Sequence, residues 1–335
     1  MHPTFRYLPL LLALGASAPL VQAKSLAVCT EASPEGFDIV QYTGAVTADA
    51  TAETVFDRLL AFKPGTTELV PGLAERWEIS ADGLRYTFHL RPGVKFHSTD
   101  YFTPSRTLNA DDVLWSFQRA LDPKHPWHAL SPRGYPYFDA MGMRELISAV
   151  DKLDELTVRF TLSRPESPFL ADLAMGFASI YSAEYGDQLL AAGTPNQLNN
   201  LPIGTGPFIL SRYAKDALVR FKANPDYFAG KPAIDNLVFA ITLDPNVRLQ
   251  KIRAGECQVA LYPKPVDVPG IKAEGTLAVD EIDALLTTYL AINTQHPPLD
   301  DARVRQAINL AIDKQAILGA VFGPGAASPA VNPYP

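Results

Sequence analysis

The sequence predicts an α/β protein that folds into more than one lobe. Its 335 residues, 47% of them apolar, can bury a large core and more than one lobe. Segments that alternate apolar and polar residues predict strands, and segments with a period near 3.6 predict helices; both kinds occur along the chain. The formal net charge is −7 and basic residues are scattered. We therefore expect no nucleic-acid partner, and instead a small molecule or a protein.

The first residues have the pattern of a secretory signal. His2 and Arg6 precede an apolar run over residues 7–21, and small residues end at Ala23. We expect a signal peptide over residues 1–23 that is cleaved on export to the periplasm. A membrane anchor is the alternative, but prolines and a glycine interrupt a run shorter than the roughly 20 residues of a span. A lipoprotein anchored at Cys29 is a weaker alternative.

The chain has two cysteines, Cys29 and Cys257. An exported protein meets an oxidising compartment, so we expect a disulfide between them. Two buried free thiols are the alternative. Closing so long a loop would stabilise the fold by at most about 5 kcal/mol in the chain-entropy model. The bridge would place the start of the mature chain beside residue 257, which makes the segment between them an inserted subdomain.

The first elements after Cys29 are predicted from small residues and from alternation. A small, flexible connection over residues 43–47 leads into a helix expected from about residue 50 to 62. A hairpin follows, because residues 84–91 alternate with period 2 and Asp82-Gly83 supplies its turn.

A helix capped by Asn109 and ended by Pro123 comes next. Its apolar face would hold Val113, Phe117 and Leu121. Residues 125–138 are expected to form a loop. Beyond it, a second hairpin contains a strand over residues 157–162, and a short helix follows over residues 168–175.

Gly204 and Gly206 stand between apolar runs, so the backbone there can pass close to other chain segments. The segment lacks the Lys-Ser/Thr ending and the helix of a phosphate-binding loop. Residues 218–228 and 236–244 are predicted strands. Residues 245–257 are predicted to form a helix that stops at a glycine.

The last predicted elements are a strand over residues 289–293 and one long helix over residues 298–323. This helix would have one apolar face and end at Gly323. The face consists of Val304, Ala307, Ile308, Ala311 and Ile312. Because the sequence stops in a loop at Pro335, we expect the natural chain to continue.

No motif of a hydrolytic nucleophile or a metal site is found. His125 and His128 are three residues apart, but neighbouring prolines oppose a helix and we expect solvated loop histidines. Two pairs of aspartates stand where helices are expected to start, and there they stabilise the first amides: Asp111 with Asp112 and Asp300 with Asp301. We therefore expect no enzyme, no metal and no cofactor.

Four segments together resemble the family 5 solute-binding proteins of ABC importers. They are LAERWEISADGLRYTFHLRPGVKFH, LNADDVLWSFQRAL, PIGTGPF and PLDDARVRQAINLAIDKQAI, in this order and spacing. Two further segments, SPEGFD and AGECQV, are closest to the dipeptide-binding members of that family. The resemblance covers essentially the whole mature chain.

The resemblance implies a type II periplasmic binding protein with two large α/β lobes and an extra inserted subdomain. Lobe I would comprise residues 24–55 and 207–281, the insert residues 56–206, and lobe II would start at residue 282 and be incomplete at residue 335. The protein would be a monomer that captures dipeptides or short peptides and delivers them to the membrane subunits of an ABC permease.

In such proteins the ligand's main chain pairs with the protein, and charged side chains hold both peptide ends. The resemblance assigns the pairing segment of lobe I to Thr43, Gly44, Ala45, Val46 and Thr47. The residues that hold the charged ends would lie beyond Pro335. Haem, longer peptides or peptide-like compounds are alternative ligands of the same class. A secreted peptide hydrolase and a chaperone or interaction scaffold are alternatives from other classes.

Overall fold

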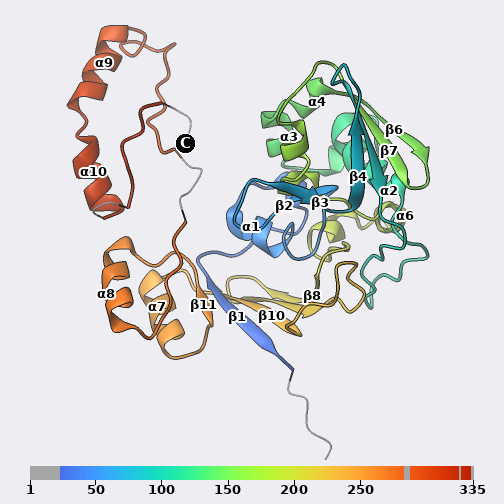
Figure 1. Cartoon of the computed structure of the whole chain (residues 1–335), viewed down its shortest axis with the longest axis horizontal. Coiled ribbons are helices and arrows are strands. Elements are labelled where there is room, and N and C mark those ends of the chain that lie inside the picture. Colours follow the sequence, from blue (N-terminus) through green and yellow to red (C-terminus); the bar gives the residue numbers. More distant parts are fainter. Residues whose placement is uncertain (1–22, 283–286, 324–325, 333–335) are drawn as a thin grey trace, which may run out of the picture.

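The computed structural model of the chain describes residues 23–282, 287–323 and 326–332. The signal peptide predicted over residues 1–23 lies, except for Ala23, outside the described residues. Figure 1 shows three parts: a sheet with flanking helices, a larger subdomain, and a pair of helices that stands apart from both.

The first sheet joins the start of the chain to residues that are some two hundred positions later. Its five strands have the order β11-β1-β10-β9-β8. Their bounds are β1 Ser25–Thr30, β8 Phe208–Ala214, β9 Leu218–Ala223, β10 Asn236–Ile241 and β11 Val259–Ala260. Strand β1 runs parallel to β10 and β11, while β9 is antiparallel to both of its neighbours, β8 and β10.

The predicted disulfide is confirmed. Cys29 on β1 is bonded to Cys257 just before β11, with their Cα atoms 5.8 Å apart. Helices α7 (Pro245–Arg253) and α8 (Val268–Glu274) lie on the side of the sheet where β11 is (Figure 1). The predicted stop of α7 is confirmed as well, because Gly255 takes a φ of 73° that favours glycine.

The subdomain contains a four-stranded antiparallel sheet with the order β4-β5-β7-β6. The bounds are β4 Ala74–Ile79, β5 Arg85–Leu90, β6 Ile147–Asp154 and β7 Thr157–Leu162. Both predicted hairpins are confirmed. In β5 the side chains of Tyr86, Phe88 and Leu90 are buried, as the alternation predicts.

Five helices pack on this sheet and around it. They are α2 Ala110–Leu121, α3 Pro136–Ala140, α4 Met143–Leu146, α5 Phe169–Asp172 and α6 Ala183–Ala191. Asn109 caps α2 in a capping box with Asp112, as predicted. The prediction that residues 125–138 are all loop is wrong at its end, where Pro136 occupies the first turn of α3 and its fixed φ suits a helix start.

Short 3-10 turns complete the described elements. They are Ile39–Gln41, His128–Leu130, Gly176–Ala178, Pro195–Asn199 and Pro265–Asp267.

The helix expected over residues 50–62 is wrong. Helix α1 spans Ala45–Ala50, and the chain then turns and forms β2 (Leu60–Phe62), which pairs with β3 (Leu69–Pro71). The carbonyl groups of Thr54 and Val55 accept hydrogen bonds from the amides of Phe208 and Gly206. A helix through residues 54–55 would need those carbonyls for its own hydrogen bonds, so tertiary pairing overrides the local preference.

The two passages of the chain between the sheet and the subdomain run side by side, and we call residues 54–58 and 203–208 the neck. At two positions of the neck the backbones approach too closely for a side chain. A Cβ atom on Gly204 would lie 2.0 Å from the carbonyl oxygen of Val55, and one on Gly206 would lie 2.6 Å from that of Thr54. The close approach predicted for these two glycines is confirmed.

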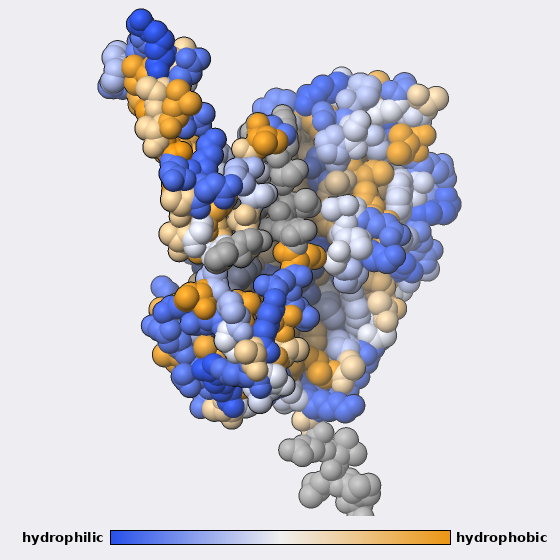
Figure 2. All heavy atoms as spheres, turned by 60° about the vertical axis from the view of Figure 1, so that its left-hand side comes forward, coloured by the Kyte–Doolittle hydropathy of each residue, from blue (hydrophilic) through white to orange (hydrophobic). Residues whose placement is uncertain are grey.

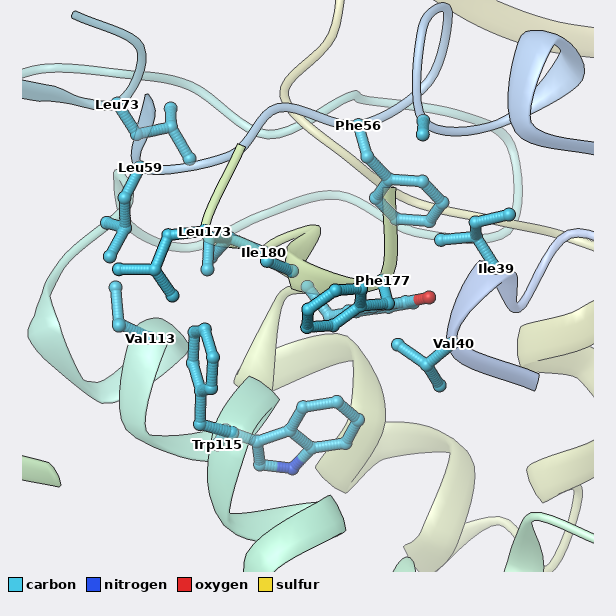
Figure 3. Close-up of a cluster of buried hydrophobic side chains, with 14 of the residues drawn as sticks. Ile39, Val40, Phe56, Leu59, Leu73, Val113, Trp115, Leu173, Phe177 and Ile180 are labelled. Atoms are coloured by element: carbon cyan, nitrogen blue, oxygen red, sulfur yellow. The ribbon is translucent and has the colours of Figure 1, made fainter. Parts of the chain in front are cut away.

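One continuous core extends from the neck into the subdomain. Figure 3 shows Phe56 and Phe177 facing Ile39 and Val40, with Trp115 of α2 on the other side of the cluster. The segment around residue 39 belongs to the N-terminal part of the chain, so its burial fixes that part against the subdomain.

The predictions for the last described residues are partly wrong. Residues 289–293 form no strand, and Tyr289 and Leu290 are 75% and 64% exposed. A strand needs a neighbour for its hydrogen bonds, and no described segment lies beside this one.

The predicted helix over residues 298–323 is divided into α9 (Ala302–Ala311) and α10 (Lys314–Val321), because Asp313 caps a new helix. Apolar residues remain on the surface of this pair, which projects from the molecule in Figure 2. None of the helices within the described ranges is long and apolar enough to cross a membrane.

The neck predicts a large effect of a small side chain. Gly204→Ala should lower the free energy of unfolding by about 2–4 kcal/mol, because its methyl group would overlap the Val55 carbonyl. Gly270→Ala in α8 is the matched control, since nothing lies within 4 Å of its Cβ position, and it should stabilise the protein by up to about 1 kcal/mol. Urea unfolding of both variants of the protein, expressed from its complete reading frame, checks this. Equal stability of the two variants would contradict the close approach.

Candidate functional site

The parallel strands of the first sheet place their carboxyl ends at one edge, where ligands bind in open α/β sheets. Glu31 follows β1, Leu243 follows β10, and Tyr262 follows β11. Helix α1 lies at the same edge, because the amide of Glu35, four residues beyond Glu31, donates to the Thr47 hydroxyl at 2.9 Å. The predicted pairing segment therefore lies near the ends of three strands.

The predicted segment Thr43, Gly44, Ala45, Val46 and Thr47 begins a helix instead of staying a flexible connection. Its first three residues remain accessible: Thr43 and Ala45 are exposed and Gly44, the N-cap of α1, is partly exposed. Val46 and Thr47 are buried. The Thr47 carbonyl also accepts a hydrogen bond from the Thr51 hydroxyl at 2.5 Å. The last two residues thus hold the segment, and the first three can meet a ligand.

Carboxylates gather at this edge. Burial, followed by the charges of Glu53 and Glu31, raises the pKa of Asp49 to about 6. One oxygen of Glu31, Oε2, is out of contact with solvent and has no hydrogen-bond partner among the described residues. Glu53 is paired with Arg58 at 3.1 Å. The edge is therefore acidic, and Glu31 keeps an acceptor that no described group uses.

Tyr262 is held in an unusual backbone conformation beside these carboxylates. Its φ is 51°, a value that side-chain-bearing residues rarely take, and its side chain is 64% exposed. The buried guanidinium of Arg248 holds this segment by donating to backbone carbonyls beyond the ends of β10 and β11, the two strands that flank β1. The acceptors are the carbonyls of Thr242, Leu243, Leu261 and Tyr262, at 2.8–3.0 Å.

A buried ion pair positions the chain just before the pairing segment. Asp38 accepts two hydrogen bonds from Arg119 of α2, at 2.6 and 3.2 Å, and a third from Gln41 at 2.7 Å. The side chains of Asp38 and Arg119 are only 2% and 1% exposed. Four aromatic rings lie within 6 Å of the guanidinium and add cation–π attraction: those of Trp115, Trp127, Tyr135 and Tyr181.

Asn199, from the 3-10 turn Pro195–Asn199, is bonded to the same segment. Its side-chain oxygen accepts from the amides of Phe37 and Asp38, and its amide nitrogen donates to the Tyr42 hydroxyl at 2.8 Å. Arg133 pairs with Glu35 at 3.1 Å. Segment 35–42 is therefore held on three sides, which fixes where residues 43–45 begin.

The two histidines considered as metal ligands have structural contacts instead. His128 is hydrogen-bonded to the Arg119 carbonyl through Nδ1, and the His125 ring lies edge-on to Trp115. In the described ranges no group of three or more His, Cys, Asp or Glu side chains could hold a metal ion. The paired aspartates act as expected, since Asp112 completes the cap of α2 and Asp301 caps α9.

Sequence reasoning did not find Glu31, Asp49, Tyr262 or Arg248. A usable signal existed for Glu31, because a polar residue directly after a parallel strand lies at the binding edge. Tyr262 and Arg248 gave none, since the backbone conformation of one and the carbonyl contacts of the other exist only in the folded protein.

Comparisons with known proteins agree on one family. The model of the bacterial extracellular solute-binding proteins, family 5, matches residues 68–335. The chain is 79% identical to di/tripeptide-binding protein 4 of Pseudomonas aeruginosa over its whole length, and spans 63% of that relative. It is 46% identical to the heme-binding protein A of Haemophilus influenzae, and the match covers 92% of this chain and 56% of that relative.

A solved structure has the same fold. A periplasmic binding protein associated with an ABC transporter of Helicobacter pylori, in complex with the peptide STSA, superposes with a TM-score of 0.88 at 36% identity. The match covers 93% of this chain and 61% of that one. The chain thus spans about three fifths of the length of these proteins.

The buried pair predicts a large loss of stability when one partner is neutralised. Asp38→Asn should lower the free energy of unfolding by about 3–5 kcal/mol, because the Arg119 charge would stay buried without a counter-ion. Asp151→Asn is the control, since its pair with Arg159 is about two fifths exposed and worth at most about 1 kcal/mol. Chemical unfolding measures the free energy of unfolding of both variants. Similar losses would contradict the larger contribution of the buried pair.

Proposed function

We propose that this chain, which belongs to the bacterial extracellular solute-binding proteins of family 5, captures dipeptides or short peptides in the periplasm and delivers them to an ABC permease. The observation that carries the proposal is the exposed, small-residue segment Thr43–Ala45 at the carboxyl edge of the parallel strands. The peptide-bound relative with the same fold supports it.

A peptide ligand would lie with its main chain against residues 43–45. Gly44 and Ala45 have little or no side chain, so the two backbones can approach closely. Each N–H or C=O group of a buried peptide that finds no partner costs roughly 1–3 kcal/mol, so a binding segment must offer free backbone groups. The acidic edge around Glu31 and Asp49 suits the positively charged amino end of a peptide better than its carboxylate.

The protein would bind its ligand without chemical change. Its relatives are binding proteins by name, and no group of three or more His, Cys, Asp or Glu side chains in the described part of the chain could hold a metal ion. The proposed cleaved leader over residues 1–23 would bring the protein to the periplasm. We propose residues 24–55 and 207–281 as lobe I, residues 56–206 as the insert and residue 282 as the start of lobe II.

Haem is the second candidate ligand, because one relative is a heme-binding protein. A thermal-shift panel on the mature protein from the complete reading frame separates the two. A ligand that binds only the folded state stabilises it by about 2.7 kcal/mol at a concentration one hundred times its Kd, and this raises the melting temperature. We expect shifts with dipeptides and tripeptides and none with free amino acids. A shift with haem alone would keep the receptor class and overturn the peptide.

Proline at Ala45 tests the pairing segment without disturbing the fold. Ala45 is the first residue of α1, where proline removes no intrahelical hydrogen bond, and Gly44 has the extended backbone that a residue before proline prefers. Ala45→Pro should therefore keep its melting temperature. Its Kd for a bound dipeptide should rise about tenfold, since one donor is lost and the ring blocks close approach.

Ala302→Pro is the matched control for that variant. Ala302 is likewise the exposed first residue of a helix, α9, and follows an extended N-cap. Calorimetry should find the control equal to the unmodified protein. A peptide affinity of Ala45→Pro equal to that of the control would refute the placement of the ligand.

A further inference from the structure

His97 is built into the neck between the subdomain and the first sheet. Its backbone amide donates to the Gly204 carbonyl at 2.8 Å, and its ring nitrogen Nε2 lies 2.9 Å from the Gly206 carbonyl oxygen. A carbonyl only accepts, so Nε2 carries the proton in this contact. Asn224, from the turn after β9, donates to the same carbonyl at 2.9 Å. One residue thus contacts both glycines at which the chain crosses itself.

The other ring nitrogen of His97 has no place for a proton. The residue is 1% exposed, and Nδ1 is out of contact with solvent and without a hydrogen-bond partner among the described residues. In the neutral ring an unpaired acceptor is tolerable. In the imidazolium form Nδ1 would be a charged donor with nothing to accept its proton, which is among the costliest states for a buried group.

The charged and titratable groups around the neck have hydrogen-bond or ion-pair partners other than His97. The Asp57 carboxyl accepts from Thr205 at 2.7 Å and from Tyr227 at 3.2 Å. Lys95 pairs with Asp226 at 2.9 Å. Arg58 pairs with Glu53. Burial dominates at His97 and, opposed only by the contact with the Gly206 carbonyl, lowers its pKa to about 4.

The sign of the pH dependence follows from this shift. An unfolded chain binds a proton at His97 below about pH 6.5, while the folded one resists until about pH 4. The stabilisation of the neutral ring is therefore complete above about pH 6.5 and is lost as the pH falls towards 4. We expect this loss of stability to weaken the neck first, because the groups that must move to admit the proton are the carbonyls and amides of residues 204–206.

We propose that His97 is an acid-sensitive latch: protonation of its buried ring loosens the neck and frees the inserted subdomain from the first sheet. The latch acts on the joint itself and does not depend on which ligand the protein binds. A periplasmic protein is exposed to the outside pH, so such a device would work within the range it meets.

Amide hydrogen exchange at the neck tests the latch. The amides of Gly206 and Phe208 are the reporters, because they donate across the neck to the carbonyls of Val55 and Thr54. In the protein from the complete reading frame, their protection should fall at least tenfold between pH 7 and pH 4.5, after correction for intrinsic exchange rates. Amides of strand β5, away from the neck, should keep theirs.

His97→Gln supplies the comparison, since a glutamine amide can donate to the Gly206 carbonyl but takes up no proton. Its neck protection should be the same at both pH values, and His128→Gln should behave like the unmodified protein. An equal loss in His97→Gln would overturn the latch. If that variant does not fold, NMR titration of the His97 ring in the unmodified protein decides instead: a midpoint near 6.5 would overturn the proposal, and one near 4 would support it.

Discussion

The close contact of two backbones at the neck is the constraint on which the rest of the structure depends. The chain enters the subdomain through residues 54–58 and returns through residues 203–208, so the position of some 150 residues is set there. Gly204 and Gly206 allow the contact, and backbone hydrogen bonds, not side chains, make most of it. Burial raises the pKa of the Asp57 carboxyl, which joins Thr205 of the returning passage and Tyr227, from the connection after β9, to its own passage. This carboxyl is acceptable in so tight a place because each of its oxygens accepts a hydrogen bond.

The Asp38–Arg119 pair also fixes one part of the chain against the subdomain, through side chains instead of backbone contact. Taking two charges out of water costs several kcal/mol per ion, and their attraction repays this only with good geometry. Two hydrogen bonds between the partners and four surrounding aromatic rings provide that geometry. An apolar pair could give similar stability, but it would not fix the direction of segment 35–42. The pair thus sets the direction in which the chain reaches the start of α1.

The sequence predicted those parts of the fold whose signals are local. The alternation of β5 and β7, the capping residues of α2 and the two crowded glycines all appear in the structure as expected. The predictions failed where distant partners decide. Residues 54–55 left the expected helix because their carbonyls pair across the neck, and residues 289–293 remained irregular for want of a neighbouring strand. At the candidate site the segment Thr43–Thr47 came only from family resemblance, and its division into three accessible and two buried residues needed the structure.

The charges at the candidate site limit what this part of the chain can do for a ligand. A short peptide has a positive and a negative end, and each needs an opposite charge once water is removed. The described edge offers carboxylates from Glu31 and Asp49, while three cations around it are occupied: Arg248 by four carbonyls, Arg58 by Glu53 and Arg133 by Glu35. Moving any of these would break a contact that holds the edge in shape. For the proposed peptide ligand, the edge would thus suit the main chain and the amino end, and the carboxylate end would need a cation other than these three. A binding site whose charges are divided between two parts of a protein would release its ligand when the parts separate, as the proposed function requires.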